Sequence, residues 1–561
     1  MISTFRTLPY KAGNRVFPLE PAPASRSYSY TGILLLLLAI GTLLRLFHFF
    51  DNRSLWTDEL FLSISLIKMS FWELATLPLA YEQKAPIGYL WMVRLCVVLF
   101  GNGEMALRLF SLLCGVASLF FFIPVARHFL RPWAVALALG MLALSTPVIY
   151  HSVEAKQYST ELLAAILALY FYTRYSQRQV GVAGLVVWGV LGGALLLFSY
   201  SVIFVLAGIA FALILHILLK KEWKKLFLYL VPFSMWLLCF GLTYIFFIGK
   251  YEDSGWLMDF FDKVYDAFMP VAPTSVSELV WFGRTAYLAL HHPLGLLLNF
   301  NHSSYDYSNL ESLLRLPVLP FLLGVTGVVF LLRQQKLHFA VLVFPVVLAL
   351  LASGLKQYPF CERFLLFLVP SFVLTIALGV EQAYKFSSGR AWVFGLLAFM
   401  LLAPPAWNVA RDVVNPNLFY KKSYNREAML QINDQFQEGD VVYLYWNATP
   451  AYQYYKEAYH LKFEAIEGKD LKSMAVDKEE YVAKLSPEFK NFEGKKRLWF
   501  VYSKSLRNNI GDFVSQPAWY HEREFIPGKM LEDLFSGYGK KYDRSVSSKG
   551  LVTTLFELKE N

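Results

Sequence analysis

Residues 51–89 read DNRSLWTDELFLSISLIKMSFWELATLPLAYEQKAPIGY, and this stretch decides how the rest of the chain is interpreted. It follows the first long apolar run, is too polar to cross a membrane and is too aromatic to be an ordinary linker. Two adjacent carboxylates, Asp58 and Glu59, stand near its start, and Lys84 stands near its end. Charged side chains at a bilayer edge reach the headgroups at little cost. The simplest interpretation is therefore a solvated loop with interfacial anchors.

The composition is that of a polytopic membrane protein. Of 561 residues, 56% are hydrophobic and only 17% are charged, whereas soluble domains carry about 25% charged residues. Separate apolar runs of about 20 residues, the length that spans a bilayer, recur along the chain. The net charge of +10 gathers in short loops between these runs, as membrane orientation requires, so we expect no nucleic-acid partner. The four cysteines lack metal-ligand spacing and are expected to be core residues.

Eleven apolar runs are expected to cross the membrane, within a range of 11–13. They lie near residues 31–50, 108–126, 133–150, 155–173, 181–198, 201–219, 226–247, 313–332, 338–354, 363–381 and 391–409. Residues 1–30 and the alternate connectors are basic, which places the N-terminus in the cytoplasm of a bacterial inner membrane or an endoplasmic reticulum. Residues 51–107 then form a first outer loop on the periplasmic or lumenal side.

The apolar segment 86–100 breaks this alternation. It is short and contains Arg94, and if it crossed the membrane it would invert every later loop. We therefore expect it to be juxtamembrane or re-entrant. The helical stretches 58–68 and 70–80 interleave aromatic and charged residues, as interfacial helices do. The first outer loop is thus expected to be several short helices lying along the membrane.

The predicted fold class is an all-α polytopic membrane protein with a small extracytoplasmic C-terminal α/β domain. We place the transmembrane domain at residues 31–411 and the soluble domain at 412–561, where strand-like runs occur at 441–446, 497–503 and 551–558. Eleven crossings put this domain on the periplasmic side, together with Asp58. The chain has no P-loop, no GxGxxG after a strand and no HExxH, which argues against an ATP-driven transporter.

Three motifs fall on this same predicted face. They read WTDE at 56–59, KAPIGY at 84–89 and YHSVEAKQY at 150–158. Carboxylates beside lysines at a bilayer surface suit an anionic lipid phosphate that is held while a nucleophile is deprotonated nearby.

In this order, and with GNGEMALRL at 101–109 and CERF at 361–364, the motifs resemble the GT-C superfamily of integral membrane glycosyltransferases. The nearest resemblance is to bacterial enzymes similar to protein O-mannosyltransferases and lipid A aminoarabinose transferases, and it covers about residues 31–175. It implies transfer of a sugar, with inversion, from a polyprenyl-phosphate donor to a periplasmic lipid, glycan or protein acceptor. The alternatives are a lipid-linked glycan flippase or transporter, and an O-antigen polymerase or ligase.

The resemblance implies roles for three acidic residues. Asp58 matches the general base that deprotonates the acceptor, and Glu59 is structural or assisting. Glu154 matches a second acid that orients the acceptor or a catalytic cation. The alternative for Asp58 is a helix N-cap, since Thr57 and Asp58 precede an amphipathic run.

Four basic residues are implied to bind the donor phosphate, namely Lys84, Arg108, Lys156 and Arg363. Lys84 could instead be a snorkelling anchor, and Arg108 could pair with Glu104 on the same helix. Arg363 could equally be a boundary residue of its span. Lys156 stands where relatives have arginine, so it keeps the charge but loses the bidentate fork.

Tyr89, His151 and Tyr158 are the candidates for lining the substrate. His151 lies beside Glu154, which could suggest a metal, but a lone histidine at the end of a span is more often simply hydrogen-bonded. We expect no metal and no cofactor, because basic side chains can neutralise a lipid-phosphate leaving group.

Overall fold

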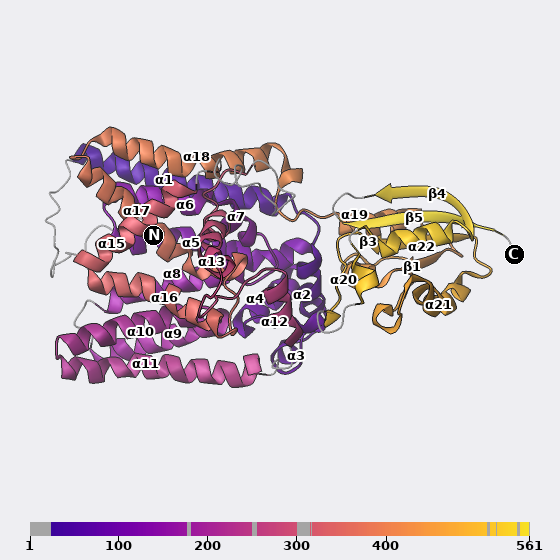
Figure 1. Ribbon diagram of the computed structural model, residues 1–561, viewed down its shortest axis with the longest axis horizontal. Coiled ribbons are helices and arrows are strands. Elements are labelled where there is room, and N and C mark those ends of the chain that lie inside the picture. The colour runs from indigo at the N-terminus through magenta and orange to yellow at the C-terminus, as the bar shows by residue number, and fades with distance from the viewer. Residues whose placement is uncertain are drawn as a thin grey trace.

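The computed structural model describes residues 24–176, 181–249, 255–299, 315, 317–512, 517–522, 524–546 and 550–559. A bundle of helices occupies one end of the molecule and a five-stranded sheet occupies the other (Figure 1). The first outer loop lies between them, so the helix that carries Asp58 sits where bundle and sheet meet.

The long helices of the bundle follow the predicted apolar runs. They are α1 (Ala24–Phe50), α5 (Glu104–Phe129), α6 (Pro132–Leu144), α7 (Thr146–Ser152), α8 (Tyr158–Tyr175), α9 (Val182–Phe198), α10 (Val202–Leu219), α11 (Trp223–Thr243), α15 (Val318–Gln334), α16 (Lys336–Gly354), α17 (Val369–Phe386) and α18 (Ala391–Val414). The run 133–150 forms a pair, α6 and α7, bent by 58°. The run 363–381 begins in a 3-10 helix, η5 (Glu362–Leu368), and 226–247 ends in η3 (Tyr244–Ile248).

These helices confirm a polytopic helical membrane protein. By length and composition, seven helices in the described ranges could cross a membrane, or eight if the bent pair counts as one span. Others, including α9 and α15, are apolar but shorter. The eleven crossings expected from the sequence therefore stay a prediction.

The first outer loop consists of short helices. They are α2 (Thr57–Lys68), α3 (Phe71–Thr76), the 3-10 turn η2 (Ala80–Glu82) and α4 (Ile87–Phe100). With 14 residues, α4 is about 21 Å long, against about 30 Å of hydrocarbon. The segments on either side of α4 both contact α20 (Thr449–Tyr459). Before α4, the Tyr81 hydroxyl donates to Gln453 Oε1. After α4, the Asn102 carbonyl accepts from the Tyr454 hydroxyl. Both flanks of α4 thus contact the same helix of the C-terminal region, and the expectation that α4 is juxtamembrane or re-entrant stays a prediction.

The region between α11 and α15 contains two further helices, α12 (Gly255–Lys263) and α13 (Val276–His291). The C-terminal region holds β1 (Val441–Leu444), β2 (Ala465–Glu467), β3 (Arg497–Ser503), β4 (Gly539–Val546) and β5 (Leu551–Leu558), in the order β2-β1-β3-β5-β4. β2, β1 and β3 are parallel, and β5 is antiparallel to both of its neighbours. The α-helices here are α19 (Asn425–Gln435), α20, α21 (Lys478–Phe489) and α22 (Pro527–Phe535), and short 3-10 turns lie at Pro416–Leu418, Trp446–Ala448, Lys472–Met474, Lys490–Phe492 and Ala518–His521.

The sheet has hydrophobic packing on both faces. On β1, Val442 and Leu444 point to one side and Val441 and Tyr443 to the other, as the period-two geometry of a strand requires. The second pair packs in a cluster with α21 and α22, and the first pair faces α19, α20 and the outer loop. Burial on both faces explains why β1 is apolar at all four positions.

The first outer loop and the C-terminal region share one hydrophobic core. Leu55 and Leu66 from the loop belong to the same buried cluster as Met429 and Tyr455 from α19 and α20. Polar contacts reinforce the join: the Leu55 N–H donates to the Tyr455 hydroxyl at 3.0 Å, and Asn425 Nδ2 donates to the Leu55 carbonyl at 2.9 Å. This packing holds the start of α2 against the C-terminal region.

Candidate active site

Asp58 lies in the first turn of α2 with its side chain 26% exposed. The residue at the N-cap is Trp56, so the alternative that Thr57 or Asp58 caps the helix is wrong. One oxygen of Asp58 pairs with Arg363 Nη1 at 2.8 Å. Arg363 is delivered by the start of η5, directly after Glu362, which has a left-handed φ of +39°.

Three cations surround the Asp58 carboxylate. Burial alone would raise the pKa of Asp58, but the charges of Arg363, Lys156 and Lys421 lower it below its ordinary value. The carboxylate is therefore ionised at neutral pH and able to accept a proton. Lys421 comes from the connector between α18 and α19, and its ammonium lies 3.7 Å from the centre of the Trp56 ring. Burial and the charge of Arg363 lower the pKa of Lys421 to about 8.

Glu59 is a structural anchor. Its side chain is 0% exposed and pairs with Arg53 at 3.0 Å and with Arg108 at 2.8 Å. A second Arg108 bond, from Nε at 2.9 Å, makes that contact bidentate, and the Ala155 N–H donates to the same carboxylate at 2.8 Å. The two arginines outweigh the effect of burial and hold the pKa of Glu59 below its ordinary value. Glu59 thereby joins α2, α5 and the 153–157 turn.

The Arg108 guanidinium is bonded to Glu59 and to carbonyl groups of the first outer loop. Its Nη1 donates to the Arg53 carbonyl, its Nη2 donates to the Ser54 carbonyl, and the remaining bonds go to Glu59. The alternative pairing with Glu104 does not form either, because Glu104 pairs with Arg426 from α19 at 3.1 Å. These bonds give Arg108 a structural role, and its predicted contact with the donor phosphate stays a prediction.

Glu154 is enclosed and fully bonded. It accepts from the Trp56 indole N–H at 3.0 Å and from the Tyr150 hydroxyl at 2.9 Å, and its other oxygen lies 2.6 Å from His151 Nδ1. Burial would raise the pKa of Glu154, but His151 and the nearby cations lower it well below its ordinary value. His151 Nε2 in turn lies 3.0 Å from His292 Nε2. Glu154 thus fixes the indole over which Lys421 lies, and its role in orienting the acceptor or a catalytic cation stays a prediction.

Lys84 of the KAPIGY motif and Lys156 of the YHSVEAKQY motif differ in how deeply they are buried. Lys156 is 5% exposed, donates to Gln83 Oε1 at 2.5 Å and contributes to the field at Asp58. Its pKa is lowered by burial. Lys84 is half-buried, one residue beyond Gln83, and burial lowers its pKa as well. Gln83 therefore ties Lys156 to the outer loop, and the phosphate-binding role of Lys84 stays a prediction.

Of the three predicted substrate-lining residues, Tyr158 and His151 lie at the site and Tyr89 lies in the hydrophobic core. Tyr158 packs beside the Arg363 guanidinium, 5.6 Å from ring centre to Cζ, and lies against His151. Tyr89 is 0% exposed and packs against Phe110 in the shared core. Tyr158 is placed to border a ligand at Arg363, whereas Tyr89 is a core residue here.

Sequence reasoning missed two contributors to the site, namely Lys421 and Gln83. Lys421 belongs to the sequence FYKK at 419–422, just beyond the last apolar run, and this aromatic-basic pattern was the available signal. Gln83 carries no local signal, because packing alone brings it to Lys156. His291 and His292 are adjacent histidines of the long outer region that could line the acceptor side, and the fold brings His292 to His151. Among the described residues, no group of three or more His, Cys, Asp or Glu could hold a metal ion.

Comparisons with known proteins agree with this architecture. Residues 84–239 match the family model described as dolichyl-phosphate-mannose-protein mannosyltransferase. ArnT from Cupriavidus metallidurans in the apo state aligns with 94% of this chain and 98% of its own, at 12% identity and a TM-score of 0.54. The structure of ArnT bound to undecaprenyl phosphate aligns over 95% and 98%, at 12% identity and a TM-score of 0.51. No curated protein sequence matches the chain.

A second kind of enzyme shares the architecture. The archaeal oligosaccharyltransferase AglB from Archaeoglobus fulgidus, in complex with an inhibitory peptide and a dolichol-phosphate, aligns with 95% of this chain and 74% of its own, at 13% identity and a TM-score of 0.50. The chain therefore has the GT-C fold, and the resemblance seen in the motifs is confirmed. Its matched segment, 84–239, is similar to the dolichyl-phosphate-mannose-protein mannosyltransferases and includes Lys84, Glu154 and Lys156, while Asp58 and Arg363 lie outside it.

Proposed function

We propose that this protein is a glycosyltransferase that moves a sugar from a polyprenyl-phosphate donor to a lipid, glycan or protein acceptor on the periplasmic face of a membrane. The observation that carries the proposal is the contrast between Asp58 and its acidic neighbours. Asp58 is partly exposed among Arg363, Lys156 and Lys421, whereas Glu59 and Glu154 are enclosed and fully bonded. A reachable base beside a cluster of cations is what transfer from a lipid phosphate requires.

In the proposed reaction, Asp58 accepts the proton of the acceptor hydroxyl. The acceptor oxygen attacks C1 of the sugar from the face opposite the phosphate, so the configuration at C1 inverts. The bond between C1 and the phosphate oxygen breaks, and the lipid phosphate leaves with both electrons. Fixed cations close to the phosphate stabilise the charge that develops on it.

Arg363 couples donor binding to the basicity of Asp58. Arg363 pairs with Asp58, and this contact lowers the pKa of the carboxyl group. A guanidinium binds phosphate with two parallel hydrogen bonds, so the donor phosphate competes with Asp58 for Arg363. Asp58 loses part of its counter-charge when the donor is bound, and its affinity for a proton rises at the moment the acceptor must be deprotonated.

Lys421, Lys156 and Lys84 complete the proposed phosphate site. Lys421 is held over the Trp56 ring, which Glu154 fixes from the other side. The positive charges replace the divalent ion that nucleotide-sugar enzymes use, so the proposed reaction needs no metal and no nucleotide. Undecaprenyl phosphate is bound by ArnT and a dolichol-phosphate by AglB, which supports a lipid phosphate as the donor carrier here.

The test separates transfer from transport. Purified protein in proteoliposomes is incubated with labelled polyprenyl-phosphate sugars and a membrane extract that supplies acceptors. The proposal predicts label in a new glycosidic product that is stable to the mild acid that releases sugar from the lipid phosphate. Movement of intact labelled donor across the bilayer without a new glycosidic bond would instead identify a flippase.

A further inference from the structure

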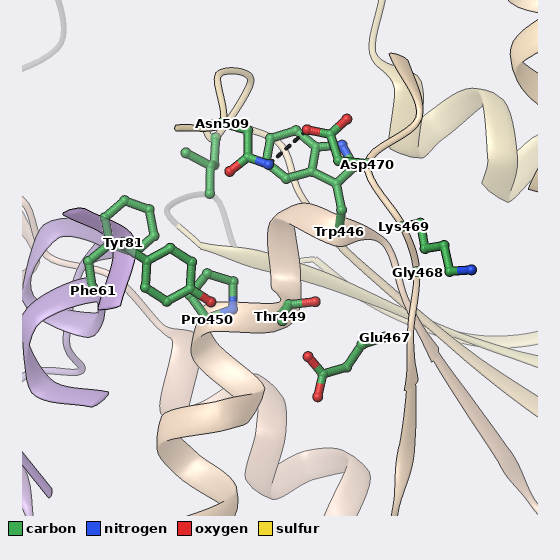
Figure 2. A pocket seen from close by; sticks show the side chains of 11 residues that line it. Phe61, Tyr81, Trp446, Thr449, Pro450, Glu467, Gly468, Lys469, Asp470 and Asn509 are labelled. Atoms are coloured by element: carbon green, nitrogen blue, oxygen red, sulfur yellow. Dashed lines mark hydrogen bonds between the residues drawn. The ribbon is translucent and has the colours of Figure 1, made fainter. Parts of the chain in front are cut away.

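A cavity of about 310 Å³ lies between the first outer loop and the C-terminal sheet, separate from the carboxylate and cations described above. Phe61 of α2 and Tyr81 of η2 form one wall (Figure 2). The opposite wall comes from the C-terminal region and contains Trp446, Thr449, Pro450, Glu467, Gly468, Lys469, Asp470, Leu506 and Asn509. The volume is at the low end of small-molecule pockets, which run from about 300 to 1,000 Å³.

The cavity occupies the edge of the sheet where ligands of open α/β sheets bind. Trp446 follows β1, Asp470 follows β2 and Asn509 follows β3, so the carboxyl ends of all three parallel strands converge on it. In open α/β sheets the crevice outside these strand ends is the usual ligand position. α20 also begins here, at Thr449, and its N-terminal end borders the cavity.

The wall from the outer loop is held in a strained backbone conformation. Tyr81 and Glu82 both have left-handed φ angles, +53° and +48°, which residues with side chains rarely adopt. The Tyr81 ring stacks on Phe61 with centroids 4.5 Å apart, and its hydroxyl donates to Gln453 Oε1 at 3.1 Å. Gln453 Nε2 donates to Glu467 Oε2 at 2.8 Å, so one side chain of α20 braces both walls.

The side chains that border the cavity favour a neutral ligand over an anion. Two carboxylates, Glu467 and Asp470, border the cavity, and Figure 2 shows the Lys469 side chain running away from it. The buried Lys472 nearby is paired with Asp470 and Asp512. Three aromatic rings and several oxygen acceptors remain. Rings bind the C–H face of a sugar, and carboxylates accept hydrogen bonds from its hydroxyl groups, whereas a phosphate would be repelled.

The cavity is close to the proposed base. Phe61 follows Asp58 by three residues on α2, so the two lie on neighbouring positions of one helix face, about 4.5 Å apart along the axis. On the other side, Gln83 Nε2 donates to the Tyr81 carbonyl while Gln83 Oε1 holds Lys156. One group bound in the cavity would therefore place the next unit of the same molecule at Asp58.

We propose that this cavity binds a neutral, hydroxyl-rich sugar of the acceptor and presents the adjacent hydroxyl to Asp58. The cavity can bind a sugar whether or not the protein transfers one. That the bound sugar belongs to the acceptor rests on the proposed function. The cavity would then supply acceptor specificity, while the cations beside Asp58 hold the donor.

The first experiment measures binding to the full chain in detergent micelles by saturation-transfer NMR. The probes are glucose, mannose, galactose and N-acetylglucosamine, with glucose 6-phosphate as the anionic control. At least one neutral sugar should bind to the wild type, and glucose 6-phosphate should not. Glu467→Gln and Phe61→Ala should each weaken binding about tenfold. Glu479→Gln, at an exposed position of α21 away from the cavity, is the matched control and should bind as the wild type does.

The variants separate this proposal from the proposed function. Asp58→Asn should bind the sugar as the wild type does while losing transfer, and Glu467→Gln should raise KM for the acceptor with little change in kcat. Sugar binding by a wild type that transfers nothing would leave the cavity proposal standing and remove the glycosyltransferase. Absence of binding by all four neutral sugars, or equal binding by Glu467→Gln and Glu479→Gln, would overturn the cavity proposal even if transfer were observed.

Discussion

Replacing Glu59 with glutamine is expected to destabilise the junction of bundle, outer loop and sheet. The carboxylate accepts from Arg53 at 3.0 Å, from Arg108 at 2.9 and 2.8 Å, and from the Ala155 N–H at 2.8 Å. A glutamine amide would turn its NH₂ group toward at least two of these donors in either orientation, and both buried guanidinium groups would lose their counter-charge. Breaking a buried ion pair of this kind costs about 3–5 kcal/mol, so we expect a loss of about that size.

The assay is denaturant unfolding of the purified full chain in micelles, followed by near-ultraviolet circular dichroism. The matched control is Glu438→Gln, at an exposed position after α19, which should change the free energy of unfolding by less than about 0.5 kcal/mol. Because the arginines depress the folded-state pKa of Glu59, its contribution is complete above the unfolded pKa of about 4.3 and is lost as the pH falls through the lower folded value. Glu59→Gln should lack that acid dependence. Equal stability of the two variants at neutral pH would refute the anchoring role.

Further predictions concern Arg363, Lys421 and divalent metal ions. Arg363→Gln should raise the pKa of Asp58, so the acid limb of the kcat/KM profile should move to higher pH; an unmoved limb would separate Arg363 from the base. Lys421→Gln should weaken donor binding about tenfold, or about 1.4 kcal/mol. Wild-type donor affinity should fall as the pH rises through about 8, where Lys421 loses its proton, while Lys421→Arg should hold its affinity to higher pH. Lys422 pairs with Asp51 rather than with the site, so Lys422→Gln is the control and should keep the wild-type dependence of donor affinity on pH. Treatment with a chelator should leave transfer unchanged, and loss of activity reversed by a divalent ion would contradict the metal-free mechanism.

The helical architecture was predictable because each apolar run is a local feature of the sequence. Strands β1, β3 and β5 were predictable for the same reason, since their residues are apolar and β-branched or aromatic over at least four positions. β2 has only three residues, and β4 reads GKKYDRSV, so neither carries a hydrophobic pattern. Both form because the neighbouring strands supply hydrogen-bond partners.

The candidate site was predictable only in part. Asp58 and Arg363 were singled out by the order of motifs, and the structure brings them together although 304 residues separate them (363 − 58 − 1). The sequence could not tell which acid Arg108 would choose, because Glu59 and Glu104 are both within reach and only the packing of α2 on α5 decides. Lys421 was missed because long-range packing brings it to Trp56, and the contact of His292 with His151 has the same origin.

The central claim is that Asp58 is the base that deprotonates the acceptor. The most direct measurement is single-turnover transfer from a labelled polyprenyl-phosphate sugar by wild type and Asp58→Asn, with the donor Kd measured in parallel. Asp434→Asn, at an exposed position of α19, serves as the matched control. The account predicts that Asp58→Asn slows transfer by about 10²–10⁴-fold, the usual contribution of a general base, while the donor still binds. Transfer by Asp58→Asn at the rate of the wild type and of Asp434→Asn would contradict it.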